Sequence, residues 1–283
     1  MLRPLLYVVG TLLVTQAAVI ATSVYLHRGL AHRALNLHPF ADWVFRFVLW
    51  FTTGQNRREW VAVHRKHHAF TDTERDPHSP LVHGFWKIQL WNVYYYVREA
   101  RNPETLARWA KDIRDDVWDR VLFNKGTLGG VVGIAAAMLV LGPGWGLLLA
   151  VSHFVLYVFV LAPSINGLGH WWGRRNFGNN SATNLRVLAW LTGGESLHNN
   201  HHAYPSSPKF SMGRFEFDPS WVVIRVLMLL RLARLVGDTE KVRRVALLDL
   251  LHSALPVSPT RESLPVGNIQ DAAAAGVAAR RTD

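Results

Sequence analysis

Three long apolar stretches interrupt a chain that is otherwise polar, charged and aromatic. Residues 4–26 carry no charge and are long enough to cross a bilayer core of about 30 Å. Residues 128–141 and 145–165 flank Gly142-Pro143-Gly144, which is a turn signal, and the first of them is rich in small residues that suit close helix packing in lipid. This pattern predicts one membrane span followed later by a membrane hairpin. A buried hairpin in a large soluble protein is the alternative.

The segments outside these spans are polar and charged. Basic residues follow the first span and the hairpin, so the positive-inside rule places residues 27–127 and 166–254 in the cytosol. Within them, helical patterns are expected around 86–98 and 103–120. From residue 255 to 283 a bias toward Ala, Pro, Ser and Thr predicts a disordered tail.

Two shorter apolar stretches are expected to lie on the membrane surface as amphipathic helices. Residues 39–53 carry Asp42 and Arg46, and a crossing here would put the histidines before and after it on opposite faces of the membrane. A helix of a soluble-type core is the alternative. Residues 219–236 mix apolar residues with arginines. The predicted fold is therefore all-α: an integral membrane protein with about three transmembrane helices, interfacial amphipathic helices and a cytosolic helical cap, in one domain over residues 1–254.

Composition narrows the function. The 283 residues carry a net charge of +11 and are 49% hydrophobic. A basic chain can bind nucleic acid, an anionic membrane or an acidic partner, but no nucleic-acid-binding motif is present and the apolar stretches favour the membrane. The absence of cysteine excludes disulfides, thiolate metal sites and iron–sulfur clusters. No cleavable signal peptide is expected, because the first apolar stretch is too long for one.

The histidines are the main candidate functional residues of this chain. Eight of the 14 histidines fall into three tight clusters, two of which have H-x-x-H-H spacing. Positions i, i+3 and i+4 share one face of a helix, so each of these clusters can project toward one point. The third cluster is a pair five residues apart, which converges only if the helix ends or loosens, as Gly29 permits. The clusters are His27 and His32; His64, His67 and His68; and His198, His201 and His202.

These histidines, with His170 after the hairpin, predict a metal site. Imidazole suits Fe, Zn, Cu and Ni, and one zinc ion takes about four ligands. Nine histidines are too many for one ion and fit two. His38, His83, His153 and His252 are expected to be ordinary surface or core histidines without a metal. His78, in Asp76-Pro77-His78, is expected to contact the ligands without binding the metal itself.

A site made almost wholly of imidazole beside a membrane favours redox or oxygen chemistry over hydrolysis. Soluble di-iron carboxylate proteins use paired Glu-x-x-His motifs. Only one such motif occurs here, from Glu195 to His198, so that class is disfavoured. Glu195 is expected to orient a ligand through a hydrogen bond.

The segments HRGLAH, HRKHH and HNNHH, with NGLGH before the last and GGE leading into it, resemble the three histidine boxes of the integral-membrane fatty-acid desaturases. The resemblance is greatest to the Δ9 acyl-CoA and acyl-lipid group and covers residues 20–236. It implies O₂ as co-substrate, a cis double bond made in a long saturated acyl chain, and two iron ions. It also implies that Asn166 acts through a water molecule and that Trp60 lines the acyl tunnel. The implied iron ligands are His27, His32, His64, His67, His68, His170, His198, His201 and His202.

The same resemblance implies partners. The acyl carrier stays open between coenzyme A, a carrier protein and a phospholipid, because animal members have a membrane hairpin before the first box where only one span fits here. A separate electron donor is expected, such as a ferredoxin, a rubredoxin or a cytochrome b5-type protein. Such a donor is acidic, so six basic residues are expected to form its docking face. The alternative is that they flank the membrane spans on the cytoplasmic side. These are Arg57, Arg58, Arg65, Lys66, Arg174 and Arg175. The expected location is a bacterial inner membrane, with the active site on the cytoplasmic side.

Two other classes of protein are alternatives to a desaturase. Membrane di-iron hydroxylases and alkane monooxygenases share histidine boxes, but the spacing after the first box and the DPH and NHHAYP contexts favour desaturation. A metal transporter needs ligands at the bilayer midplane, and a haem protein needs paired histidines on facing spans. Here the histidines follow the spans or lie in polar segments.

Overall fold

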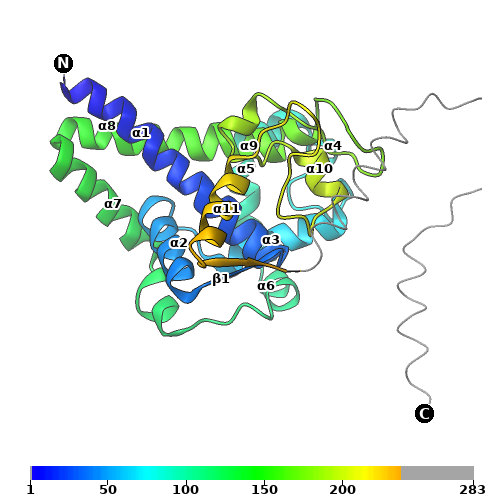
Figure 1. Cartoon of the computed structure of the whole chain (residues 1–283), viewed down its shortest axis with the longest axis horizontal. Coiled ribbons are helices and arrows are strands. Elements are labelled where there is room, and N and C mark those ends of the chain that lie inside the picture. Colours follow the sequence, from blue (N-terminus) through cyan, green and yellow to red (C-terminus); the bar gives the residue numbers. More distant parts are fainter. Residues whose placement is uncertain (1, 237–283) are drawn as a thin grey trace, which may run out of the picture.

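The structure is a computed structural model that describes residues 2–236, and this part of the chain is mainly helical (Figure 1). The predicted tail lies outside the described residues. The elements that correspond to the predicted spans are α1 (Leu2–Ala21), η1 (Thr22–Ala31), α7 (Gly126–Leu141), α8 (Pro143–Phe154), η3 (Val155–Leu161), α9 (Ala162–Asn166) and η4 (Leu168–His170). The others are β1 (Leu35–Leu37), α2 (Pro39–Thr52), α3 (Arg57–Phe70), α4 (Pro80–His83), α5 (Phe85–Ala100), α6 (Pro103–Trp109), η2 (Asp119–Phe123), η5 (Leu188–Trp190), α10 (His198–Ala203), α11 (Pro219–Leu229) and β2 (Ala233–Leu235).

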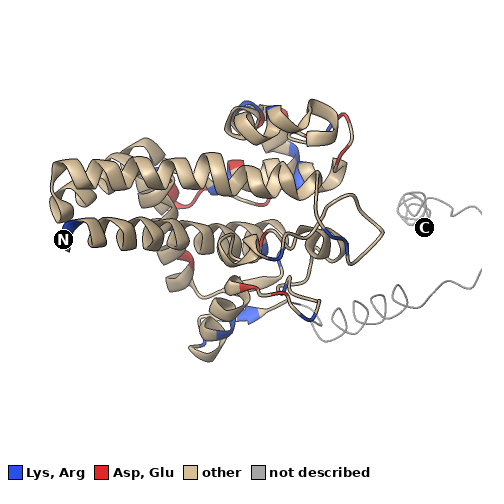
Figure 2. Ribbon diagram, turned by 90° about the horizontal axis from the view of Figure 1, so that it is seen from above, with Lys and Arg blue, Asp and Glu red and all other residues tan. Residues whose placement is uncertain are grey.

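Two continuous helical rods, Leu2–Ala31 and Pro143–His170, are long and apolar enough to cross a membrane, by length and composition. They coincide with the first predicted span and with the second arm of the predicted hairpin. α7, the first arm, has 16 residues and is about 24 Å long, so its crossing stays a prediction. α1, α7 and α8 project from the rest of the molecule (Figure 1), and charged residues gather away from the two long rods (Figure 2).

Small residues let α7 approach its neighbours closely, as its composition predicts. A Cβ atom added to Gly129 would overlap the carbonyl oxygen of Trp50, and one on Gly133 would overlap that of Phe51. Both carbonyls belong to α2, so α2 packs directly on α7. α2 is the helix predicted over 39–53, and His38 begins it by accepting a hydrogen bond from the backbone N–H of Phe40 at 3.2 Å.

His153 has the structural role that the sequence predicts for it. It is buried in α8, where its ring nitrogens lie 3.0 Å from the Thr15 hydroxyl of α1 and 3.0 Å from the Thr52 carbonyl oxygen of α2. One imidazole thus satisfies polar atoms on two neighbouring helices. A buried, fully partnered histidine of this kind needs no metal.

The helix expected over 103–120 is wrong beyond Trp109. α6 ends there, and helical structure resumes at Val117, just before η2. The physical reason is a pair of aspartates that form a capping box and so begin a new helical segment at Val117. Asp116 accepts from the N–H of Asp119 at 2.9 Å, and Asp119 accepts from that of Asp116 at 3.0 Å.

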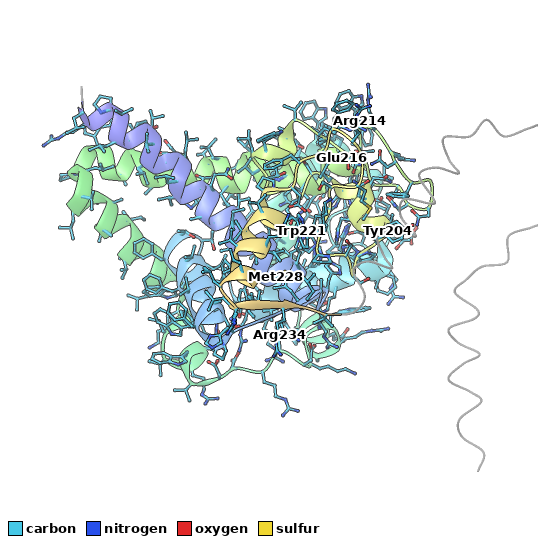
Figure 3. The ribbon with its side chains drawn as sticks, in the orientation of Figure 1. Tyr204, Arg214, Glu216, Trp221, Met228 and Arg234 are labelled. Atoms are coloured by element: carbon cyan, nitrogen blue, oxygen red, sulfur yellow. The ribbon has the colours of Figure 1, made fainter. Side chains whose placement is uncertain are left out.

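The helix expected over 219–236 is also too long. α11 ends at Leu229, Arg231 adopts a positive φ of 60°, and the chain then forms β2. β2 pairs antiparallel with β1, with Leu35 opposite Leu235. The all-α prediction therefore needs one correction, a two-stranded sheet that fastens the end of α11 to the segment just after η1. Figure 3 shows Trp221 and Met228 on α11 and Arg234 on β2.

Candidate metal centre

Three segments far apart in sequence bring the clustered histidines together: η1, α3 and α10. η1 is a π-helix, in which hydrogen bonds run from residue i+5 to residue i. The backbone N–H of His32 donates to the carbonyl oxygen of His27 at 3.0 Å, directly after this helix. The expected loosening at the first pair is therefore confirmed, and it turns two histidines five residues apart toward the same space.

The histidines form two groups, within each of which the nitrogens that could bind an ion all lie within 4.8 Å of one another. The larger group has five members: His27, His32, His64, His68 and His201. Its Nε2 atoms converge at short range, 2.9 Å from His27 to His201, 2.8 Å from His32 to His64 and 2.9 Å from His68 to His201. The smaller group has four members: His67, His170, His198 and His202. In it, the Nε2 atom of His202 lies 3.3 Å from that of His67 and 3.2 Å from that of His198.

Each H-x-x-H-H cluster is divided between the two groups, so the prediction that each projects toward one point is wrong. In α3, His64 and His68 join the five-histidine group and His67 joins the other. In α10, His198 and His202 belong to the four-histidine group and His201 belongs to the five-histidine group. The physical reason is rotation, because residues i and i+4 nearly align, whereas neighbouring residues point about 100° apart.

The donor set fits a pair of metal cations. Burial, followed by the proximity of other imidazoles, lowers the pKa well below the ordinary value for six of the histidines, which keeps them neutral. These are His32, His64, His68, His198, His201 and His202. Each neutral ring has one nitrogen with a free lone pair, and the Nε2 atoms of several rings point toward the same space. The buried Nε2 atom of His170 has no hydrogen-bond partner within the described residues. A cation between the rings satisfies these lone pairs, and the neutral imidazole ligands that they offer suit iron.

Carboxylates contact the Nδ1 atoms of three of these rings. The Nδ1–H of His67 donates to Asp76 at 2.9 Å, that of His170 donates to Asp72 at 2.9 Å, and Glu195 pairs with the Nδ1 atom of His27. A carboxylate can only accept, so Nδ1 carries the proton and Nε2 is left free to face the group. Such partners fix the orientation of a metal-binding histidine.

The sequence predicted this role for Glu195 but missed it for Asp72 and Asp76. The signal was available, because both aspartates follow the second histidine cluster within eight residues of His68. Burial opposes ionisation of Asp76, but the neighbouring His67 prevails and holds the pKa of Asp76 well below its usual range. Asp76 in turn raises the pKa of His67 against the effect of burial.

His78 lies where the sequence placed it, beside the predicted ligands. Its ring stacks on that of His67, with the centroids 4.7 Å apart. Burial, aided by the nearby His67, lowers the pKa of His78 to about 3, so the ring is neutral at physiological pH.

A buried arginine that sequence analysis did not single out links the centre to α11. Arg28 is fully buried and donates to Glu195 at 3.0 Å and to both carboxylate oxygens of Asp218 at 3.0 Å. Asp218 begins α11 by accepting from the backbone N–H of Trp221 at 3.0 Å. The guanidinium also lies 3.7 Å from the ring centroid of Phe210. The chain of contacts therefore runs from His27 through Glu195 and Arg28 to α11.

An apolar cavity of about 150 Å³ opens onto both histidine groups. His27 and His64 of the larger group and His198 of the smaller one form part of its wall. Trp60 lines it too, and its ring stacks on His64 with the centroids 4.8 Å apart. Asn166 also lines the cavity and donates to the side-chain oxygen of Asn92 at 3.1 Å.

The six basic residues predicted as a docking face do not form one surface of free charges. Arg57 pairs with Asp119, Arg65 pairs with Asp112 at 2.6 Å, and Lys66 pairs with Glu99 at 2.6 Å. These three cations stabilise contacts within the chain. Arg174 and Arg175 are exposed, as predicted.

Replacing Asp76 with asparagine tests the role of the carboxylates. A neutral amide polarises His67 less and does not fix its tautomer, so iron affinity is expected to fall about 10- to 100-fold. The measurement is iron retained by purified protein during titration with a chelator. Asp115→Asn is the matched control, because Asp115 is exposed and bonds Asn124 instead of a histidine. Equal retention by the wild type and Asp76→Asn would refute the assignment.

Two adjoining imidazole groups at the ends of apolar helices fit a histidine-rich metal-binding protein of the membrane-associated type. Comparison with known proteins gives the family. Residues 3–215 match the family model described as fatty acid desaturase. The chain is 32% identical over 232 residues to delta-9 acyl-lipid desaturase 1 of Arabidopsis thaliana, an alignment that covers 78% of this chain and 72% of that protein. The chain therefore belongs to the fatty acid desaturase family and is an oxidoreductase of lipid metabolism.

Other relatives differ in carrier and in double-bond position. The acyl-CoA C20 delta5-desaturase of Anemone leveillei is 31% identical over 224 residues, which cover 76% of this chain and 68% of that protein. The sn-1 stearoyl-lipid 9-desaturase of Synechocystis sp. is 31% identical over 216 residues, which cover 74% of this chain and 64% of that protein. Similar identities to proteins with such different names establish the family and leave the exact substrate to experiment.

Proposed function

We propose that this protein is an O₂-dependent fatty-acyl desaturase that introduces one cis double bond, at Δ9, into a long saturated acyl chain. Two iron ions are the proposed cofactors, one for each histidine group, with all nine histidines as ligands. The acyl carrier is coenzyme A, a carrier protein or a phospholipid. The proposed site faces the cytoplasm, at the inner ends of the two spanning-length helices.

The observation that carries this proposal is the apolar cavity that touches both histidine groups. A saturated methylene pair offers no charge and no hydrogen bond, so shape alone must hold it in place. The cavity wall combines Trp60 beside His64 with apolar side chains of the second long rod, such as Leu161 and Ile165. A chain lying there is held against both groups and shielded from bulk water, as oxidation of an unactivated C–H bond requires.

The reaction has a defined balance. One saturated acyl chain, O₂, two electrons and two protons give one monounsaturated chain and two water molecules. When bound, the iron ions would supply the activation of O₂ that this oxidation needs. Asn166 is proposed to orient a water molecule at the wall of the cavity, beside its bond to Asn92. A separate donor is proposed to supply the electrons, such as a ferredoxin, a rubredoxin or a cytochrome b5-type protein, since these 283 residues contain no cysteine to hold an iron–sulfur cluster.

The deciding experiment is fatty-acid analysis of a host strain that lacks aerobic desaturation. Expression of this protein is expected to produce a new monounsaturated acid that depends on oxygen, and its fragmentation pattern gives the position of the double bond. Gas chromatography with mass spectrometry makes the measurement. A Δ9 product supports the proposal in full, and another position corrects the regiochemistry. Hydroxylated acids would instead identify a membrane hydroxylase.

A further inference from the structure

A second cavity, of about 520 Å³, reaches the histidines from another side. It is lined by His32 and His68 of the larger group and by His202 of the smaller one, together with Arg65, Asn180 and Ser181. The acyl cavity reaches the same two groups through His27, His64 and His198. The linings of the two cavities have no histidine in common, and each histidine group contributes to the lining of both cavities.

The division has a chemical consequence. An acyl chain in the first cavity blocks that approach to the site, while the ring edges of His32, His68 and His202 stay accessible from the second. The lining of the second cavity includes imidazole, guanidinium, amide and hydroxyl groups, which suit water and a polar partner instead of a lipid chain. Two electrons and two protons must reach the site while the substrate is in place, and this cavity provides a route.

The rim of this cavity is positively charged. Arg65 lines it and shares Asp112 with Arg33, at 2.6 and 2.7 Å, so two cations are balanced by one carboxylate. The side chain of Arg33 is 66% exposed. On the other side, Arg175 is exposed and donates to the carbonyl oxygen of Ser181 at 2.7 Å, which places a third cation at the rim. Asp72, which follows the lining residue Thr71, accepts hydrogen bonds from His170 and Ser181.

We propose that this cavity is the docking site of an acidic one-electron redox protein, which passes electrons to the two groups through the ring edges of His32, His68 and His202. The inference rests on the proposed function, which includes a separate electron donor, and adds the place where that donor attaches. Each encounter oxidises one donor molecule by one electron and transfers no atom. Two encounters supply the electrons for one double bond, and the two protons come from water.

The position of the cavity suits a partner from the aqueous phase. α3 and α10, which carry His68 and His202, lie at the end of the molecule away from the α7–α8 turn (Figure 1). Tyr204, just after α10, lies in the same part (Figure 3). A membrane around α1, α7 and α8 therefore leaves this face uncovered. Positive charge at the rim steers an acidic protein and repels a basic one.

The test reverses the rim charge. In Arg33→Glu/Arg175→Glu, the KM for an acidic donor is expected to rise at least 10-fold at low ionic strength, with a smaller rise at high salt. The donors tried are a plant-type ferredoxin, a rubredoxin and a cytochrome b5. Arg98→Glu/Arg120→Glu carries the same change of charge on exposed arginines of α5 and η2, and it is expected to behave as the wild type.

A second measurement needs no donor protein. The iron-loaded protein is reduced by the hydroquinone form of anthraquinone-2,6-disulfonate, an anion, and by the one-electron-reduced form of methyl viologen, a cation, and the reduction is followed by absorbance. The rim variant is expected to react several-fold more slowly with the anion and no more slowly with the cation. Equal anion rates in the two double variants would overturn the docking proposal, even if desaturation is intact. Absence of a desaturated product in every variant, including the wild type, would instead refute the proposed function.

Discussion

Replacement of His201 by alanine is expected to abolish desaturation and to lower the iron content from two ions per chain toward one or none. The reason is the central place of this ring in the five-histidine group. Its Nε2 atom lies 2.9 Å from that of His27 and 2.9 Å from that of His68, and the residue is completely buried. No water-exposed group can take its place. Metal analysis of purified protein and fatty-acid analysis of cells give the two measurements.

The control for this prediction is His38→Asn. His38 is exposed and begins α2 through its side chain, and asparagine can supply the same helix cap. Iron content and product yield should both match the wild type. If His201→Ala kept two ions and full activity, His201 would not be a ligand, and the assignment of the larger group would have to be revised.

The second large effect is expected on stability, from Arg28→Leu. The substitution leaves Glu195 and Asp218 buried in the absence of their shared cation, and breaking a buried ion pair from one side costs about 3–5 kcal/mol. Most globular domains have only about 5–15 kcal/mol of total stability, so the yield of folded protein should fall sharply. Arg28→Lys should fail as well, because one ammonium group cannot reproduce the forked contacts. Thermal unfolding in detergent and yield of monodisperse protein make the measurement.

Arg33→Leu is the matched control for Arg28→Leu. Both are arginines beside the same histidine pair, but Arg33 is exposed and its pair with Asp112 is worth about 0–1 kcal/mol. A shift of a few degrees at most is therefore expected. If Arg28→Leu unfolded at the same temperature as Arg33→Leu, the buried network would not stabilise the fold, and its link from His27 to α11 would lose its support.

The histidines were the most predictable part of the site, because their spacing alone marks them. The condition set for His27 and His32, a helix that loosens near Gly29, is met by η1. The division of neighbouring histidines between two groups could not be read from spacing, since it depends on where a second helix places its own rings. Asp72 and Asp76 went unassigned for a similar reason, because a carboxylate near a histidine in sequence becomes its partner only when the loop between them folds back.

The fold was predictable where hydrophobic length decides it and less so where polar contacts do. Apolar stretches located the starts of α1, α7 and α8 within a few residues. The segment after Trp109 has helical composition, but Asp116 and Asp119 form a capping box that begins a separate helical segment at Val117. β1 and β2 are three residues long, too short for any alternation to show, and they are fixed by a pairing across two hundred residues, from Leu35 to Leu235.

The unequal distribution of the two histidine groups along the chain bears on how the protein is made. Four of the five members of the larger group lie before residue 69, whereas three of the four members of the smaller one come at residue 170 or later. A ribosome adds about 5–20 residues per second, so the early group is nearly complete several seconds before the late group has more than one ring. The larger group nevertheless stays incomplete until His201 of α10 has been made. α10 also supplies His198 and His202 to the smaller group, so both proposed metal positions are completed at the same late stage of synthesis.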